Sequence, residues 1–157
     1  QNCRIDVGIM TLAEARPGLT NTLIAEQHLV ACLPRRHRLA RADSVSLAEL
    51  AAEALVMREP GSMTQQLLDR VLADGGLAPR IRLRVASREA LKEAVAQGIG
   101  LGAVLHDEAG SDMRLRVVPI TGIASRAGIY AVSLNESTDL PAVAAFVDLA
   151  GKLRADG

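Results

Sequence analysis

The chain has 157 residues and a formal net charge of zero, with 18 basic and 18 acidic side chains. Apolar residues make up 49% of it, enough for a buried core, whereas aromatic residues make up only 1%. Domains that bind DNA carry surplus positive charge to displace phosphate counterions, and stacking on bases requires aromatic rings. We therefore expect no binding of duplex DNA by this segment, and a core of Leu, Val, Ile and Ala that suits a sheet covered by helices.

The cysteine spacing and the hydropathy argue against a zinc site, a redox motif and a membrane-spanning helix. Cys3 and Cys32 lie far apart and belong to no CxxC pair, so neither zinc nor a redox motif is predicted. Two free thiols fit a reducing compartment, and a disulfide between them stays open. The longest apolar run is well short of the ~20 residues of a membrane helix. With no signal-peptide pattern, we expect a cytoplasmic protein, and a chain that starts at Gln1 is interpreted as a fragment.

Strands and helices are predicted to alternate along most of the chain. Strands are expected at residues 5–10, 23–33, 54–57, 81–85, 99–105, 115–120 and 128–134. Pro34 and the basic cluster at residues 35–41 interrupt the pattern after the second strand, as an exposed crossing between lobes would. We interpret this cluster as a solvated basic turn, with a phosphate site as the alternative.

Serine and proline signals mark the predicted helix starts. Ser46 and Glu49 have the spacing of a capping box, and Ser62 and Gln65 repeat it before a second helix. The last helix is expected to begin at Pro141, because proline is favoured at the first helical position. Its apolar face consists of Val143, Phe146, Val147, Ala150 and Leu153.

Residues 85–105 (VASREALKEAVAQGIGLGAVL) form the most informative segment. A strand is followed by a short amphipathic helix that begins at Ser87 and is stopped by Gly98, and a buried strand with Gly100 and Gly102 comes next. This order predicts a right-handed crossover of an open α/β sheet, in which ligands gather at the loops that start the helices.

Four blocks in the same order resemble the effector-binding domain of LysR-type transcriptional regulators. They are residues 4–9 (RIDVGI), residues 29–40 (LVACLPRRHRLA), residues 46–50 together with 58–68 (REPGSMTQQLL), and residues 85–105 with QGIGL at 97–101. The chain departs from the family pattern where Cys3-Arg4-Ile5 replaces a usual glycine, and where Arg38 and His106 replace common prolines. The resemblance covers nearly the whole chain.

The resemblance implies an α/β fold of two lobes, like the type 2 periplasmic binding proteins, with two crossing strands and an effector in the cleft between the lobes. Residues 1–38 and 121–157 would form the first lobe, with residues 5–10, 23–33 and 128–134 in a mixed sheet, and residues 39–120 the second lobe. The first lobe would lack its opening strands. The family's winged helix-turn-helix is absent, so DNA would be bound only through a missing N-terminal domain.

The best candidate for an effector site is the loop that precedes the second long helix. It contains Arg58, Gly61, Ser62, Met63 and Thr64. Glycine permits close approach of a ligand to the backbone, and a helix start with free N–H groups attracts carboxylate, phosphate or sulfate. The alternative is that Ser62 only caps its helix.

Four further residues are candidates for effector contact. Ser87 and Arg88 repeat the same arrangement at the next helix, although Arg88 could simply be solvated. Met10 and Thr11 end a strand of the first lobe, where ligands of such sheets bind, although Met10 could belong to the core. His106 follows the glycine-rich strand and either lines the cleft or lies exposed in a loop.

No catalytic residue, metal site or cofactor is predicted. His28, His37 and His106 occur in unrelated settings, and no HExxH, GxSxG or P-loop motif is present. The sequence favours a domain that senses a small anionic effector within a transcription factor. The alternatives are a solute-binding protein of a transport system and an enzyme on the same architecture. The chemical identity of the effector stays open among amino acids, aromatic acids, phosphonates and sulfate.

The resemblance also implies side-by-side pairing of the domains. Without the opening strands of the first lobe, the edge beside residues 5–10 would be unpaired, and an apolar strand edge is a template for another chain. We expect a homo-oligomer, a dimer or larger.

Overall fold

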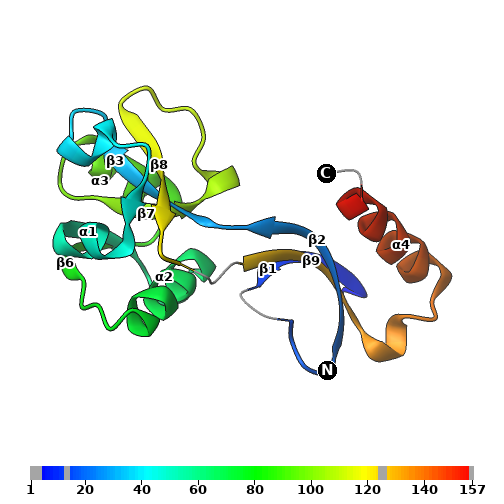
Figure 1. The fold of residues 1–157 in the computed structure, drawn as a ribbon. Helices are drawn as coiled ribbons and strands as arrows, with labels where there is room; N and C mark the ends of the chain where they lie inside the picture. Colours follow the sequence, from blue (N-terminus) through cyan, green and yellow to red (C-terminus); the bar gives the residue numbers. More distant parts are fainter. Residues whose placement is uncertain (1–4, 13–14, 124–126, 156–157) are drawn as a thin grey trace. The chain divides into compact units, whose positions relative to one another are not determined.

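The chain folds into two compact units. The terminal unit is formed by both chain ends, Gln1–Gln27 and Arg126–Gly157, and the central unit by His28–Ser125. The computed structural model describes residues 5–12, 15–123 and 127–155 (Figure 1). No helix of these described residues is long and apolar enough to cross a membrane.

The terminal unit contains a three-stranded sheet. β9 (Ala127–Leu134) lies between β1 (Val7–Leu12) and β2 (Leu19–Gln27) and is antiparallel to both. The expected mixed sheet is therefore wrong for the described strands, all of which pair antiparallel. α4 (Pro141–Ala155) packs along β2 and begins at the predicted proline. Its Val143 and Ala150 are buried as expected, Phe146 and Val147 are half-buried, and the side chain of Leu153 lies outside the described residues.

The central unit is built on β3 (Leu29–Pro34), whose residues 29–33 are at most 1% exposed. β3 lies between β7 (Gly102–Leu105) and β8 (Leu115–Thr121) and is antiparallel to both, and the short β4 (Val45–Ser46) runs parallel to the end of β8. β5 (Ala54–Arg58) pairs in parallel with β6 (Arg80–Val85).

A backbone bridge joins these two groups of strands. Leu101 pairs in parallel with Leu55. The amide of Val56 donates to the carbonyl of Leu101 at 2.7 Å, and the amide of Leu101 donates to the carbonyl of Ala54 at 2.8 Å. β7 is thereby linked to β5, and the connection from β6 through α3 (Arg88–Ala96) to β7 passes over β5.

Helices cover both faces of the central sheet (Figure 1). Leu91, Ala94 and Val95 of α3 join a buried cluster with Val30 and Val56. Residues on either side of Val56 point to the opposite face. α2 (Met63–Asp74) packs against the same strands, and α1 (Leu47–Ala52) packs against β5.

The first capping box is confirmed. The Ser46 hydroxyl accepts from the amide of Glu49, and the carboxylate of Glu49 accepts from the amide of Ser46 at 2.8 Å. The amide and the hydroxyl of Ser46 both donate to this carboxylate, and these hydrogen bonds lower the pKa of Glu49. Three short 3-10 helices complete the structure: η1 (Arg38–Arg41), η2 (His106–Glu108) and η3 (Asn135–Ser137).

The structure corrects several predicted boundaries. The extended run at residues 23–33 is divided at His28, because β2 pairs with β9 in the terminal unit while β3 pairs with β7 and β8. The chain thus enters the central unit at His28 and leaves it after Ser125, instead of after residues 38 and 120. The strand expected at 99–105 is also shorter, because only Gly102–Leu105 joins the ladder with β3 and Leu101 forms the isolated bridge.

Gly100 is required by the close approach of β5. A Cβ atom at position 100 would lie 2.5 Å from the carbonyl oxygen of Ala54, and a backbone atom of a paired strand cannot move away cheaply. Gly98, which ends the preceding helix as predicted, has a φ of 73°.

Replacing Gly100 tests this bridge. We expect Gly100→Ala to lower the free energy of unfolding by about 1–3 kcal/mol, because overpacking displaces the backbone hydrogen bonds at Leu101. Urea denaturation measures the change. Gly8→Ala is the control, since nothing lies within 4 Å of a Cβ at that position. Equal stabilities of the two variants would contradict this account.

Candidate functional site

One edge of the central sheet collects the predicted site residues. β5, β6 and β7 run in the same direction, so their carboxyl ends, Arg58, Val85 and Leu105, lie at the same edge. β3 is antiparallel to β7 and begins there, with Leu29 opposite Leu105. The loops that start α2, α3 and η2 therefore leave from one side of the sheet, which we call the loop edge.

The start of α2 has no side-chain cap. Ser62 occupies the cap position but its hydroxyl makes no capping hydrogen bond, so the second predicted capping box is wrong. The reason is that Gln65, only 1% exposed, is used elsewhere. Its Oε1 accepts from the amide of Arg58 at 2.7 Å and its Nε2 donates to Asp69 at 2.7 Å. Among the hydrogen bonds of the described residues, none satisfies the amides of Met63 and Thr64 in the first turn.

The start of α3 is capped. The hydroxyl of Ser87 accepts from the amide of Ala90 at 3.0 Å, as its predicted position at a helix start implies. Arg58 connects this loop to the start of α2, because its Nη2 donates to the carbonyl of Ala86 at 3.2 Å. The side chain of Arg58 is only 17% exposed, and its buried Nε has no hydrogen-bond partner among the described residues. Nη2 of Arg58 also lies 3.6 Å from Oε1 of Glu59, and Nε keeps an unused donor.

Glu108 is an important member of the loop edge that sequence reasoning missed. Its Oε1 lies 3.3 Å from Nη1 of Arg88, and its Oε2 accepts from the hydroxyl of Thr64 at 3.5 Å. Its backbone carbonyl accepts from Nζ of Lys92 at 3.4 Å. The carboxylate therefore links the first turns of α2 and α3. The signal that could have found it is its position in the loop directly after a buried strand.

Two histidines pack against each other at the same edge. The rings of His28 and His106 are stacked with centroids 4.9 Å apart, and the amide of His106 donates to the carbonyl of His28 at 3.0 Å. Nδ1 of His106 lies 3.0 Å from Asp107, and the ring is 59% exposed. Both alternatives for His106 hold in part, since it is exposed and also belongs to the loop edge. His28 was expected within a strand but lies between β2 and β3.

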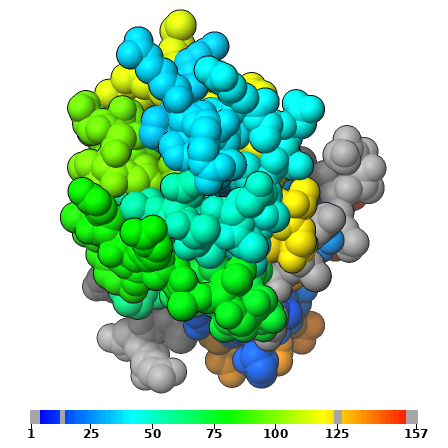
Figure 2. Space-filling model, turned by 60° about the vertical axis from the view of Figure 1, so that its left-hand side comes forward, coloured from blue at the N-terminus to red at the C-terminus, as the bar shows by residue number. Residues whose placement is uncertain are grey.

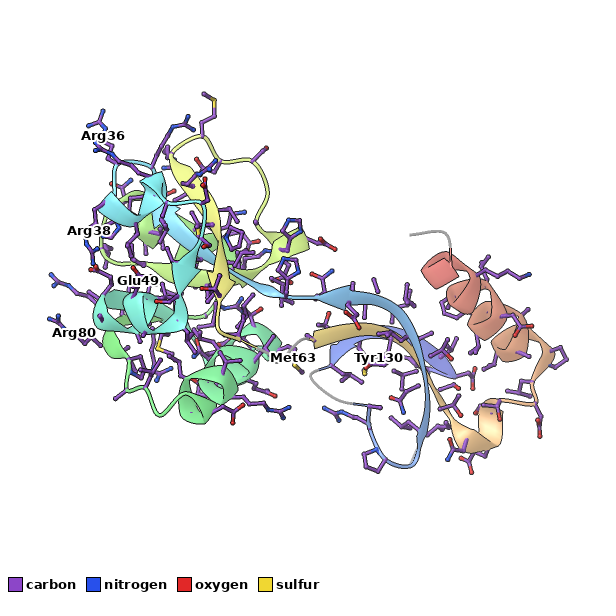
Figure 3. The ribbon with its side chains drawn as sticks, viewed as in Figure 1. Arg36, Arg38, Glu49, Met63, Arg80 and Tyr130 are labelled. Carbon is purple, nitrogen blue, oxygen red and sulfur yellow. The ribbon has the colours of Figure 1, made fainter. Side chains whose placement is uncertain are left out.

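The predicted site residues divide between the two units. Those of the central unit lie together at the loop edge: Arg58, Gly61, Ser62, Met63, Thr64, Ser87, Arg88 and His106 (Figure 3 labels Met63). Met10 and Thr11 lie in β1 of the terminal unit, where they pair with Tyr130 and Ile129. Their contact with the same effector remains a prediction. Met10 is 42% exposed, which argues against its placement in the core.

The described residues of the loop edge provide neither a metal site nor a reactive cysteine. The described residues contain no group of three His, Cys, Asp or Glu side chains that could hold a metal ion. Cys32 is free and buried in the core, and burial raises its pKa to about 11, so the thiol stays protonated at neutral pH. Cys3 lies outside the described residues, and the question of a disulfide with it lies there too.

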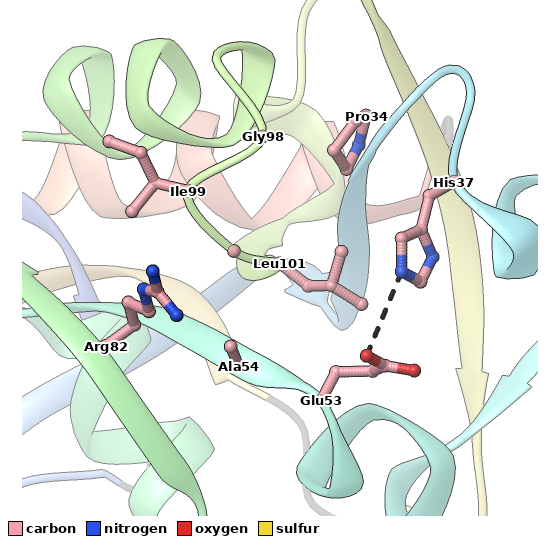
Figure 4. A pocket seen from close by; sticks show the side chains of 9 residues that line it. Pro34, His37, Glu53, Ala54, Arg82, Gly98, Ile99 and Leu101 are labelled. Atoms are coloured by element: carbon pink, nitrogen blue, oxygen red, sulfur yellow. Dashed lines mark ion pairs between the residues drawn. The ribbon is translucent and has the colours of Figure 1, made fainter.

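A separate hollow of about 250 Å³ lies where β5 begins, at the end of that strand opposite to the loop edge (Figure 4). His37, Glu53 and Arg82 line it, together with the glycine turn after α3. Nε2 of His37 lies 3.9 Å from Glu53, which also pairs with Arg38. The carboxylate is therefore already neutralised within the protein, and this hollow is a weaker candidate than the loop edge.

Comparison with known proteins gives the family. The model of the LysR substrate-binding domain matches residues 1–154. The chain belongs to this family. A RuBisCO operon transcriptional regulator from Allochromatium vinosum is 32% identical to this LysR substrate-binding domain over 145 residues, which cover 90% of the chain and 48% of the relative. The chain spans between one third and about half of the curated relatives that it matches first, with 33%, 48% and 44% of their lengths.

Solved structures share the fold of this LysR substrate-binding domain. The effector-binding domain of QuiR in complex with shikimate has a TM-score of 0.83 at 24% identity, over 99% of this chain and 74% of that one. The regulatory domain of CcmR from Synechocystis PCC6803 in complex with 2-PG also has a TM-score of 0.83 at 24% identity, over 98% and 75%. The expected type 2 periplasmic-binding-protein-like architecture is thereby confirmed.

The different states of the two helix starts can be tested by stability. We expect Ser87→Ala to lower the free energy of unfolding by about 1 kcal/mol, because it removes a working helix cap. Ser62→Ala should change it by less than about 0.5 kcal/mol, because its hydroxyl caps nothing. Urea denaturation compares the two variants. Equal losses would mean that Ser62 caps α2 after all.

Proposed function

We propose that this domain binds a small anionic effector at the loop edge, and that binding alters how a longer cytoplasmic transcription regulator contacts DNA. The observation that carries the proposal is the uncapped first turn of α2 beside the unsatisfied Nε of Arg58. The proposed effector contacts are Met10, Thr11, Arg58, Gly61, Ser62, Met63, Thr64, Ser87, Arg88 and His106.

The chemistry of the loop edge suits an anion. The free amides of Met63 and Thr64 lie at the positive end of the α2 dipole, which favours negative charge. A guanidinium binds carboxylate or phosphate oxygens through two donors, and burial of Arg58 strengthens such hydrogen bonds. Gly61 leaves the backbone accessible, since nothing lies within 4 Å of a Cβ at that position.

The similar proteins support the same class of ligand. Shikimate, bound in the QuiR structure, is a small carboxylate, and the matched relative from Allochromatium vinosum is a transcriptional regulator. These likenesses favour effector sensing over the two alternatives, a transport protein and an enzyme. DNA would be contacted by other parts of the longer regulator, since the segment has no net positive charge.

A panel of small anions tests the proposed function. We expect at least one of shikimate, phosphate, sulfate and amino acids to raise the melting temperature in a saturable manner, because a ligand of the folded state stabilises it. Arg58→Lys should then weaken binding by about tenfold in calorimetry, because the ammonium cannot supply two fixed donors. Unchanged affinity in Arg58→Lys, or stabilisation only by cations, would refute an anion site at this edge.

A charge-removing variant sharpens this test. Glu108→Gln should bind the same anion about threefold to tenfold more tightly, because the carboxylate between Thr64 and Arg88 repels it. Glu89→Gln is the matched control, since Glu89 also pairs with Arg88, at 3.1 Å, but is 72% exposed. Its effect should be small because solvent screens an exposed charge. Weaker binding by Glu108→Gln would instead make Glu108 a supporting residue of the site.

We also propose that the domain forms a homo-oligomer, a dimer or larger, through its unpaired strand edges. β1 and β6 each pair on one side only among the described strands. Ile9 of β1 is 60% exposed, and Ile81 and Leu83 of β6 are 45% and 37% exposed. Exposed apolar side chains on an open edge favour pairing with another chain.

Light scattering tests the oligomer. We expect the mass of at least a dimer for the unchanged chain and a shift toward monomer for Leu83→Lys, because a charge on the edge opposes strand pairing. Leu149→Lys is the control, since Leu149 is 58% exposed but lies on the helix α4 and not on a strand edge. A monomeric unchanged chain at working concentrations would contradict this proposal.

A further inference from the structure

A second surface of the central unit lies at the end of β3 opposite to the loop edge. The amide of Arg35, directly after β3, donates to the carbonyl of Arg114 at 2.9 Å, directly before β8. This hydrogen bond extends the ladder between the two strands, so the turn at 35–36 and the loop at 110–114 are held together. In Figure 2 the sky-blue turn and the yellow start of β8 lie next to each other at the top.

Two hollows lie on this surface and share Arg35 and Met113. The larger, of about 410 Å³, is lined also by Arg36 and Ala96, and the smaller, of about 310 Å³, also by Arg116. Met113 is 83% exposed. A large apolar side chain is thus exposed to solvent where the two hollows meet. It contributes little to the packing of the central unit.

The charges around Met113 are of two kinds. Arg114 is already neutralised, with Nη2 2.8 Å from both Asp112 and Glu93, and its guanidinium lowers the pKa of Asp112 to about 2. Arg35, Arg36 and Arg116 are exposed, and the described part of the chain offers their guanidinium groups no acceptor or ion-pair partner. In a chain of zero net charge, this is a local excess of unpaired positive charge.

We propose that this surface docks an acidic peptide segment of a partner protein, with an apolar side chain of the segment against Met113 and its carboxylates on Arg35, Arg36 and Arg116. Arginine presents a planar fork that matches a carboxylate, and methionine adapts to varied apolar partners and is enriched at protein interfaces. A nucleic-acid backbone would use the arginines but has no use for an exposed methionine between them. The apolar centre therefore favours a peptide.

Methionine methyl groups offer a site-resolved test, because the chain has only 4 methionines. The full chain, labelled with ¹³C in these methyls, is titrated with a synthetic peptide of aspartates and glutamates around one leucine. We expect a saturable shift of the Met113 signal, while the signal of Met57, which is 1% exposed, stays constant and reports intact folding. Absence of any Met113 shift at millimolar peptide would overturn the proposal.

Charge-reversal variants identify the surface. Arg36→Glu combined with Arg116→Glu should raise the Kd of the peptide at least tenfold, and Met113→Ala should raise it several-fold. Arg80→Glu is the control and should leave it unchanged, since Arg80 is also exposed but lines neither of the two hollows. An equal loss in the control would reduce the binding to general electrostatics and refute the site.

Two further probes separate the peptide from other polyanions. A peptide with aspartate in place of its leucine should bind at least fivefold more weakly, because it lacks the group that contacts Met113. Duplex DNA at physiological salt should leave the Met113 signal unshifted. Equal affinity of the leucine-free peptide, or tighter binding of the duplex, would overturn the proposal in favour of a polyanion surface. These readouts are independent of the effector panel, which concerns the other end of β3.

Discussion

The bridge between Leu101 and Leu55 is the contact on which the loop edge depends. Through it, β7 runs parallel to β5 and β6, so the residues that follow all three strands emerge on the same side. Arg58, Ser87 and His106 are distant in sequence and are brought together by this common direction alone. Gly100 makes the bridge possible, because any Cβ would meet the carbonyl of Ala54.

Charge is distributed unevenly over the central unit, around a sheet whose strands β3 and β7 are buried. At the loop edge, Arg58 and Arg88 accompany a free helix start, and Glu108 supplies a counter-charge from within the protein. An effector anion would have to compete with this carboxylate, which gives the domain a means of setting the affinity of its ligand. At the far end of β3, Arg114 is paired with Asp112 and Glu93, whereas Arg35, Arg36 and Arg116 have no such counter-charge among the described residues.

The sequence predictions that failed share one physical cause. Residues far apart in the sequence compete with local ones as hydrogen-bond or strand partners. Ser62 and Gln65 have the spacing of a capping box, but Oε1 of Gln65 instead accepts from the amide of Arg58 at the end of β5. The apolar run at 23–33 looks continuous, yet its two halves pair with different sheets because His28 lies where the chain passes between units. A local pattern cannot show which distant strand will be the partner.

The sequence by itself determined the family, the alternation of strands and helices, the caps at Ser46 and Ser87, and the glycine that ends α3. These features follow from residue spacings and short sequence motifs, which can be recognised in a single sequence. It also indicated the loop at 58–64, because glycine and serine before a helix have a known chemistry. Only the tertiary structure decided that Ser62 leaves its helix open, that Glu108 lies between Thr64 and Arg88, and that His28 stacks on His106. Each of these depends on strand direction and side-chain competition between segments far apart in the chain, which no local pattern encodes.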